Sequence, residues 1–160
     1  MIVIGYQGIG KSTLAGRDNK FIDLESGNFW IDGKRADDWY KPYCKIAEHL
    51  SQQGYIVFVS SHEVVRKQLQ DSNEPIVVIY PSIDLKKEWI EKLEDRYMKS
   101  GLEKDYKALM NAKDRYEENI EELKNCSSNG YLMINLEITK MEYDLETGLI
   151  YLKNAIDMID

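Results

Sequence analysis

Short apolar runs alternate with longer amphipathic segments along the whole chain. The apolar runs are four to six residues long and mostly rich in Ile, Val and Phe, which is typical of buried strands. They predict five strands, at residues 1–4, 21–24, 55–59, 76–80 and 131–136. The segments between them carry apolar residues at helical spacing, such as Leu85, Trp89 and Leu93. They predict a short helix that starts near Ser12, and further helices over about 37–53, 63–70, 85–99, 103–124 and 149–159.

Strands that alternate with helices indicate an α/β domain, in which a parallel sheet is covered by helices on both faces. In such sheets ligands bind at the carboxyl ends of the strands. That rule points to the segments near Gly5, Asp23, Ser60 and Tyr80. We therefore expect any functional site to lie where these four strand ends meet.

Polar or glycine-containing segments separate the helices. Residues 17–20 are predicted to end the first helix early. Ser100-Gly101 is predicted to join two long helices as an αα-hairpin. Thr147-Gly148 is predicted to form a turn before the last helix.

The most informative segment is Gly-Tyr-Gln-Gly-Ile-Gly-Lys-Ser-Thr at residues 5–13, which fits the P-loop pattern G-x-x-x-x-G-K-[ST]. It follows a predicted strand and opens a predicted helix, as the pattern requires, which disfavours an accidental glycine turn. Glycines let backbone N–H groups approach phosphate oxygens closely, and the helix start adds further N–H donors. We expect Lys11 to reach the β- and γ-phosphates, Ser12 to bind Mg²⁺ and Thr13 to touch the α-phosphate. The predicted nucleotide-binding residues are Gly5, Gln7, Gly8, Ile9, Gly10, Lys11, Ser12 and Thr13.

Composition narrows the class of protein. A length of 160 residues suits a single domain over residues 1–160, and 43% hydrophobic residues suffice for a core. The net charge of −7 argues against an extended nucleic-acid surface, although a pocket can still be locally positive. Two cysteines, Cys44 and Cys126, predict reduced thiols in a cytoplasmic protein. No run approaches the roughly 20 apolar residues of a membrane helix, so no membrane partner is expected.

The chain resembles the small P-loop kinases, the group that includes nucleoside monophosphate kinases and shikimate- and gluconate-type kinases. The similar segments are GYQGIGKST, FIDLE at the second strand, VFVSSH at the third, and the helical pair after the fourth. It is also similar to compact kinases carried by phages of Gram-positive bacteria. The resemblance implies a three-layer α/β/α fold with a five-stranded parallel sheet in order 2-3-1-4-5 and a helical lid over about 85–124. It also implies ATP and Mg²⁺ as cofactors.

Two acidic residues stand at the end of the second strand. Asp23 and Glu25 are two residues apart, so strand geometry points them to the same side. Asp23 is a candidate for positioning Mg²⁺, binding the acceptor or accepting a proton from it. Glu25 is a weaker candidate for the acceptor, because it replaces the second Asp of the F-x-D-x-D pattern of shikimate-like relatives. The alternative for both is a solvated loop acid.

Four arginines are candidates for phosphate binding, because guanidinium groups stabilise the charge that spreads over a transferred phosphoryl group. Arg96 and Arg115 are expected to close over the phosphates with the helical pair. Arg35 and Arg66 are expected on the acceptor side. The alternative for each is a surface ion pair.

Two more residues have mainly structural alternatives. Trp30 belongs to an aromatic-rich stretch between the second and third strands, and either stacks on an acceptor base or closes the core. His62 ends the third strand, where a structural role is favoured over phosphate sensing. This strand end, Ser60-Ser61-His62, lacks the acid that switch and motor ATPases use to hold Mg²⁺, which favours a kinase.

The sequence thus predicts an ATP-dependent phosphotransferase. The preferred hypothesis for its acceptor is a (deoxy)nucleoside monophosphate. Two alternatives remain open. One is a kinase of a hydroxyl acceptor, such as a metabolite, a nucleoside or a polynucleotide 5′ end. The other is a nucleotide-binding regulatory protein without catalysis. The expected oligomeric state is a monomer or homodimer.

Overall fold

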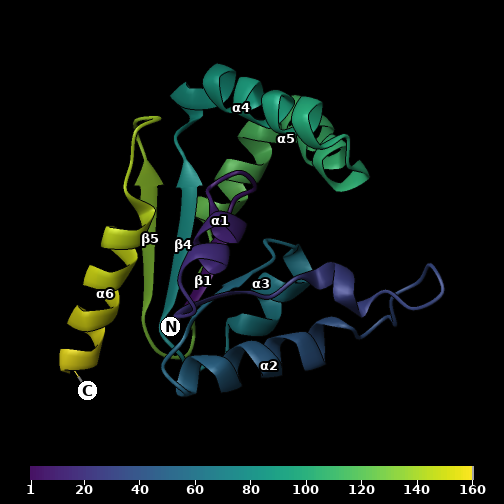
Figure 1. Ribbon diagram of the computed structural model, residues 1–160. Helices are drawn as coiled ribbons and strands as arrows, with labels where there is room; N and C mark the ends of the chain where they lie inside the picture. The colour runs from purple at the N-terminus through teal and green to yellow at the C-terminus, as the bar shows by residue number, and fades with distance from the viewer. Residues whose placement is uncertain (160) are drawn as a thin grey trace.

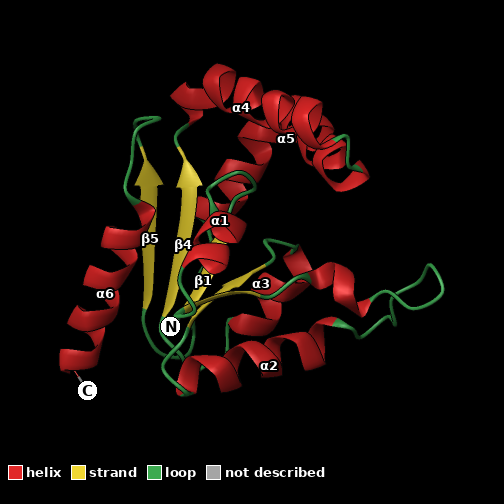
Figure 2. Cartoon of the chain, viewed as in Figure 1, coloured by secondary structure: helices red, strands yellow, loops and turns green. Residues whose placement is uncertain are grey.

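Five parallel strands form one sheet in the order β2-β3-β1-β4-β5 (Figures 1 and 2). The computed structural model describes residues 1–159. The strands are β1 (Ile2–Gly5), β2 (Phe21–Asp23), β3 (Ile56–Val59), β4 (Ile76–Pro81) and β5 (Met133–Ile138). The α/β class predicted from the sequence and the strand order implied by the family resemblance are confirmed.

Within residues 1–159, six α-helices connect and cover these strands. They are α1 (Lys11–Arg17), α2 (Tyr40–Gln52), α3 (Glu63–Leu69), α4 (Lys86–Ser100), α5 (Glu103–Lys124) and α6 (Leu145–Ile159), with 3₁₀ turns η1 (Ser26–Phe29) and η2 (Ile83–Leu85). Right-handed crossovers place α1 on one face and α2, α3 and α5 on the other. An Arg17–Glu146 ion pair joins α1 to α6, and an Arg66–Glu122 pair joins α3 to α5, in agreement with these layers. Figure 1 shows α4 lying across the ends of the strands.

β1 forms the centre of the core. It pairs with β3 on one side and β4 on the other, so Ile4 stands beside Val59 and Val78. All four residues of β1 are buried, as are all of β3 and β4. Strands buried on both faces read as continuous apolar runs, which is why these elements were predictable.

Several element boundaries differ from those predicted. Residues 37–39 form a turn, and α2 begins at Tyr40 with Pro42 in its first turn, where the missing N–H has no helical partner to lose. β5 begins two residues later than predicted and extends to Ile138, because it continues in register alongside β4.

The prediction of a turn at Thr147-Gly148 is wrong. Both residues lie in the first turns of α6. The helix starts earlier because the Asp144 carboxylate accepts hydrogen bonds from the backbone N–H of Thr147, at 3.1 Å, and from its hydroxyl, at 2.7 Å. This is a side-chain cap, and it overrides the weak helix preference of glycine.

The helical pair α4–α5 turns at Gly101, whose φ of 64° caps α4, as Ser100-Gly101 predicted. α5 contains a kink that the sequence did not indicate. Arg115 there has φ −137° and ψ 25°. The Asn119 side-chain amide donates to Asn111 Oδ1 at 2.6 Å across the kink. Residues eight apart lie about 12 Å apart along a straight helix, so this bond depends on the bend.

The two cysteines are not joined to each other: Cys44 is buried and Cys126 is half-buried, both as free thiols. Across residues 1–159, none of the helices has the length and apolar character needed to cross a membrane.

Adjacent valines of α3 provide a matched test of the packing. Val65 is fully buried, whereas Val64 is 39% exposed. We expect Val65→Ala to lower the free energy of unfolding by about 2 kcal/mol, because it removes buried methyl groups and leaves a cavity. Val64→Ala should change it by less than about 0.5 kcal/mol. Urea denaturation of both variants measures this, and equal effects would contradict the packing of α3 described here.

Candidate functional site

A cavity of about 900 Å³ opens at the carboxyl ends of β1, β2 and β3. The chain leaves β1 toward β2 and leaves β3 toward β4, so the crevice between β1 and β3 is the switch point of the sheet. Ligands bind at such points in open α/β sheets. Most of the predicted site residues line this cavity: Gln7, Gly8, Ile9, Gly10, Lys11, Ser12, Thr13, Asp23, Glu25 and Arg96.

The glycine-rich loop, residues 6–10, connects β1 to α1 at the cavity wall. Gly8 and Gly10 have φ of 88° and 109°, a left-handed backbone that side chains with a Cβ rarely adopt. Gly10 stands directly before α1, and no side chain caps this helix start. The N–H groups there are therefore free of a side-chain acceptor, and they border a cavity.

Lys11 lies at the centre of the charged groups. Its ammonium donates to the carbonyl of Gly5 at 3.3 Å. Burial lowers the pKa of Lys11, while Asp23 and Glu25 raise it and Arg96 lowers it. A lysine in this setting gains from an added anion, because the anion offsets the cost of burying its charge.

Asp23 lies close to Lys11 at the end of β2. Burial raises the pKa of Asp23; Lys11 and Lys104 act in the opposite direction, and Glu25 adds to the increase. Asp23 and Glu25 both line the cavity, as their spacing predicted. A carboxylate with a raised pKa is a better proton acceptor than an ordinary one.

Tyr43 of α2 fixes the ends of β2 and β3 relative to each other. Its hydroxyl donates to the carbonyl of Leu24 at 2.6 Å and accepts the backbone N–H of Ser60 at 2.8 Å. The Ser60 hydroxyl contacts Nδ1 of His62, and the His62 ring meets Trp39 edge to face at 5.7 Å. Burial, assisted by Arg35, lowers the pKa of His62, which favours a neutral imidazole. These bonds account for the structural role favoured for His62.

Arg96 reaches the cavity from α4 and is held by a buried carboxylate. Its Nε donates to Asp105 at 2.8 Å, and Asp105 is only 4% exposed. The second oxygen of Asp105 accepts the Ser100 hydroxyl at 2.5 Å. Because the ion pair uses Nε, the two terminal amino groups of the guanidinium are left for other acceptors.

Six charged residues of the cavity were not singled out as site residues from the sequence: Arg17, Lys92, Lys104, Asp105, Asp144 and Glu146. Among the described residues, Lys11, Lys92 and Lys104 form no ion pair, although all three line the cavity. Lys104 and Asp105 come from the start of α5, about eighty positions beyond Asp23. No sequence pattern marked them, since their position depends on how the helical pair folds over the sheet.

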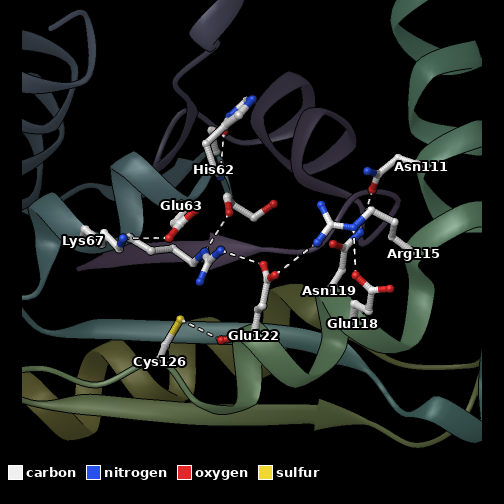
Figure 3. A network of polar contacts seen from close by, with 12 residues as sticks. His62, Glu63, Lys67, Asn111, Arg115, Glu118, Asn119, Glu122 and Cys126 are labelled. Atoms are coloured by element: carbon white, nitrogen blue, oxygen red, sulfur yellow. Dashed lines mark hydrogen bonds and ion pairs between the residues drawn. The ribbon is translucent and has the colours of Figure 1, made fainter.

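Three of the four predicted arginines lie outside the cavity, and two of them pair with carboxylates of α5. Figure 3 shows Arg115 with Glu118 and Glu122, to which it donates at 3.0 and 3.3 Å. Arg66 bonds the carbonyl of Ser61 at 2.9 Å and Glu122 at 2.9 Å. Neither arginine lines the cavity, and both follow the ion-pair alternative.

The predicted aromatic and basic residues of the 29–39 segment form a separate cluster. The Arg35 guanidinium lies 4.1 Å from the ring centroid of Trp39 and 5.1 Å from that of Trp30. Trp30 is 51% exposed. Neither Trp30 nor Arg35 lines the cavity, and Gly5 takes part only through its carbonyl.

The cavity suits Mg²⁺ that arrives with a phosphate ligand. Across residues 1–159, no group of three or more His, Cys, Asp or Glu side chains could hold a metal ion by itself. Magnesium in nucleotide sites keeps several waters and takes only one or two protein oxygens. Ser12 and Asp23 line the same cavity and supply oxygens of the required kind.

Compared with models of known protein families, the chain matches none, and no curated protein sequence matches it either. What the protein does is therefore inferred from the residues of the cavity.

The charge balance at Asp23 can be measured directly. We expect its carboxyl to titrate above the usual 3.8, and its pKa to rise further in Lys11→Met, which removes a nearby positive charge. The pKa of Asp23 is higher in the folded state than in the unfolded state. The contribution of Asp23 to the free energy of unfolding therefore falls as pH rises from the unfolded-state pKa to the folded-state pKa. Carbon-13 NMR of labelled Asp carboxyls measures both pKa values.

Asp144 is the internal control, because Thr147 hydrogen bonds hold its pKa below the usual value and Lys11 does not contribute. A pKa of Asp23 at or below 3.8, or one unchanged in Lys11→Met, would contradict this account.

Proposed function

We propose that the protein is a phosphotransferase that moves the γ-phosphoryl group of Mg-ATP to a nucleoside monophosphate. One observation carries the proposal. The glycine-rich loop and the partly buried Lys11 line the same cavity as a second set of polar residues, which lies at the ends of β2 and β3 and includes Asp23 and Ser60. A donor and an acceptor can then meet in one site, as phosphoryl transfer requires.

The donor side consists of the glycine-rich loop and the start of α1. Backbone N–H groups of the loop and the Lys11 ammonium would bind the β- and γ-phosphates. The Ser12 hydroxyl would bind Mg²⁺, and Thr13 would contact the α-phosphate. Magnesium, when bound, neutralises charge on the β- and γ-phosphates.

The acceptor side consists of Asp23, Glu25 and Ser60, faced by Arg96 and Lys104 from the helical pair. Arg96 and Lys104 supply positive charge for a second phosphate. An oxygen of the acceptor phosphate attacks the γ-phosphorus while the bond to the β–γ bridging oxygen breaks, and ADP leaves. Such an acceptor is already ionised, so it needs no base, and Asp23 serves the metal or the acceptor sugar.

A hydroxyl acceptor is the second candidate, and the raised pKa of Asp23 favours it. In that reaction the carboxylate of Asp23 takes the hydroxyl proton as the oxygen attacks the γ-phosphorus. The two candidates share the donor side and differ in what Asp23 does.

Lys11 tests the donor side. We expect Lys11→Met to lower kcat/KM by at least about 100-fold, because it removes the charge that binds the transferred phosphate. Coupled measurement of ADP release, together with calorimetry of ATP binding, detects the loss. Lys45→Met, which changes an exposed lysine of α2, should retain full activity. Undiminished turnover in Lys11→Met would refute the proposed donor site.

A panel of acceptors tests the acceptor side. Mg-ATP is incubated with nucleosides, nucleoside monophosphates and 5′-hydroxyl oligonucleotides, and ADP is followed. We expect acceptor-dependent ADP with monophosphates, and a loss of about tenfold or less in Asp23→Asn, where no base is required. Turnover with hydroxyl acceptors alone, reduced about 100-fold or more in Asp23→Asn, would instead establish the second candidate.

A further inference from the structure

We infer that Trp89 and Tyr143 are positioning residues that hold the glycine-rich loop from the protein side and direct its amides into the cavity. That the loop amides bind phosphate rests on the proposed function. That Trp89 and Tyr143 hold the loop rests only on the contacts described below. Trp89 belongs to α4, and Tyr143 precedes α6, so neither is near the loop in sequence.

Each residue binds one carbonyl of the loop. The indole Nε1–H of Trp89 donates to the carbonyl of Gln7 at 2.9 Å. The hydroxyl of Tyr143 donates to the carbonyl of Ile9 at 2.8 Å. Two alternate peptide units of a five-residue loop are thereby fixed by side chains from elsewhere in the fold.

Fixing a carbonyl also fixes an amide. The carbonyl of Gln7 shares a peptide unit with the N–H of Gly8, and that of Ile9 shares one with the N–H of Gly10. In a trans peptide the two groups point in opposite directions, and residues 1–159 contain no cis peptide. Both N–H groups therefore point away from the side chains that hold the carbonyls, and both glycines line the cavity.

Trp89 and Tyr143 also form one unit. Their rings stack with centroids 6.2 Å apart at 16°. The Lys92 ammonium lies 4.5 Å from the Trp89 ring centroid and donates to the Tyr143 oxygen at 3.1 Å. A cation bound to both aromatic groups resists their separation, so a shift of one carbonyl is opposed at the other.

Close contact behind the loop explains a requirement for glycine. A Cβ on Gly8 would lie 3.0 Å from Leu93 Cδ2 and 3.2 Å from Trp89 Nε1. The indole can donate to the loop because Gly8 leaves this space open. The loop and α4 are thus fitted to each other at this position.

Tyr116 provides a matched control for the alternative that these are ordinary core contacts. Its hydroxyl is also buried and donates to a backbone carbonyl, that of Ser82, at 2.8 Å. Tyr116→Phe therefore removes a bond of the same kind that does not reach the loop carbonyls, and keeps the ring.

The first measurement uses the protein without ligand. Amide hydrogen exchange is followed by mass spectrometry for peptides covering residues 5–13 in the wild type, Tyr143→Phe and Tyr116→Phe. We expect faster exchange of these peptides in Tyr143→Phe and wild-type exchange in Tyr116→Phe. Equal exchange in both variants would overturn the positioning role.

The second measurement is calorimetric binding of inorganic tripolyphosphate. Trp89→Phe is the sharper variant, because Trp89 does not line the cavity and loses no ligand contact. We expect about threefold to tenfold weaker binding in Trp89→Phe and in Tyr143→Phe, as for the loss of one hydrogen bond. Tyr116→Phe should bind with the affinity of the wild type. Wild-type affinity for tripolyphosphate in both Trp89→Phe and Tyr143→Phe would overturn the inference while leaving the proposed function intact.

The two ideas fail in different ways. If the wild type binds no tripolyphosphate, the proposed function falls, and the exchange result decides the positioning role alone. If either Trp89→Phe or Tyr143→Phe does not fold, the other variant tests the same prediction, since each removes a single hydrogen-bond donor to the loop.

Discussion

Burial of β1 between β3 and β4 is the constraint on which the rest of the structure depends. A strand that is covered on both faces and paired on both edges cannot shift without exposing its apolar residues. The chain must therefore turn back immediately after Gly5, and it does so through a loop in which Gly8 and Gly10 have positive φ. Because neighbouring strands are parallel, the ends of β2 and β3 arrive at the same edge, and their polar residues meet the loop there.

The cavity at this edge is organised by side chains that do not themselves react. Tyr43 ties Leu24 to Ser60, Asp105 orients Arg96, and Trp89 and Tyr143 hold the loop carbonyls. Each uses a buried donor or carboxylate to fix a neighbour in the cavity wall. Charged groups surrounded in this way lose little energy to reorganisation when an anion binds, which favours phosphate chemistry.

Local sequence signals predicted the centre of the site. Residues 5–12 carry the glycine pattern in eight consecutive positions, and strand alternation alone predicted that Asp23 and Glu25 lie on the same side. The arginines were predicted less well. Arg96 lines the cavity, whereas Arg66 and Arg115 bond Glu122, and Arg35 stacks on two tryptophans. A long flexible side chain near a strand end has many possible partners, and its choice depends on helices far away in sequence. The same reason hid Lys104 and Asp105, which come from the start of α5.

The sequence by itself determined the α/β class, the position of the glycine-rich loop and the acidic pair at the end of β2. These depend on periodicity, backbone freedom and chain connectivity, which are properties of neighbouring residues. Only the tertiary structure decided which cations face the loop, where α5 bends and which aromatic side chains hold the loop carbonyls. Those choices depend on contacts between residues up to 134 positions apart, as between Ile9 and Tyr143, and no short pattern encodes them.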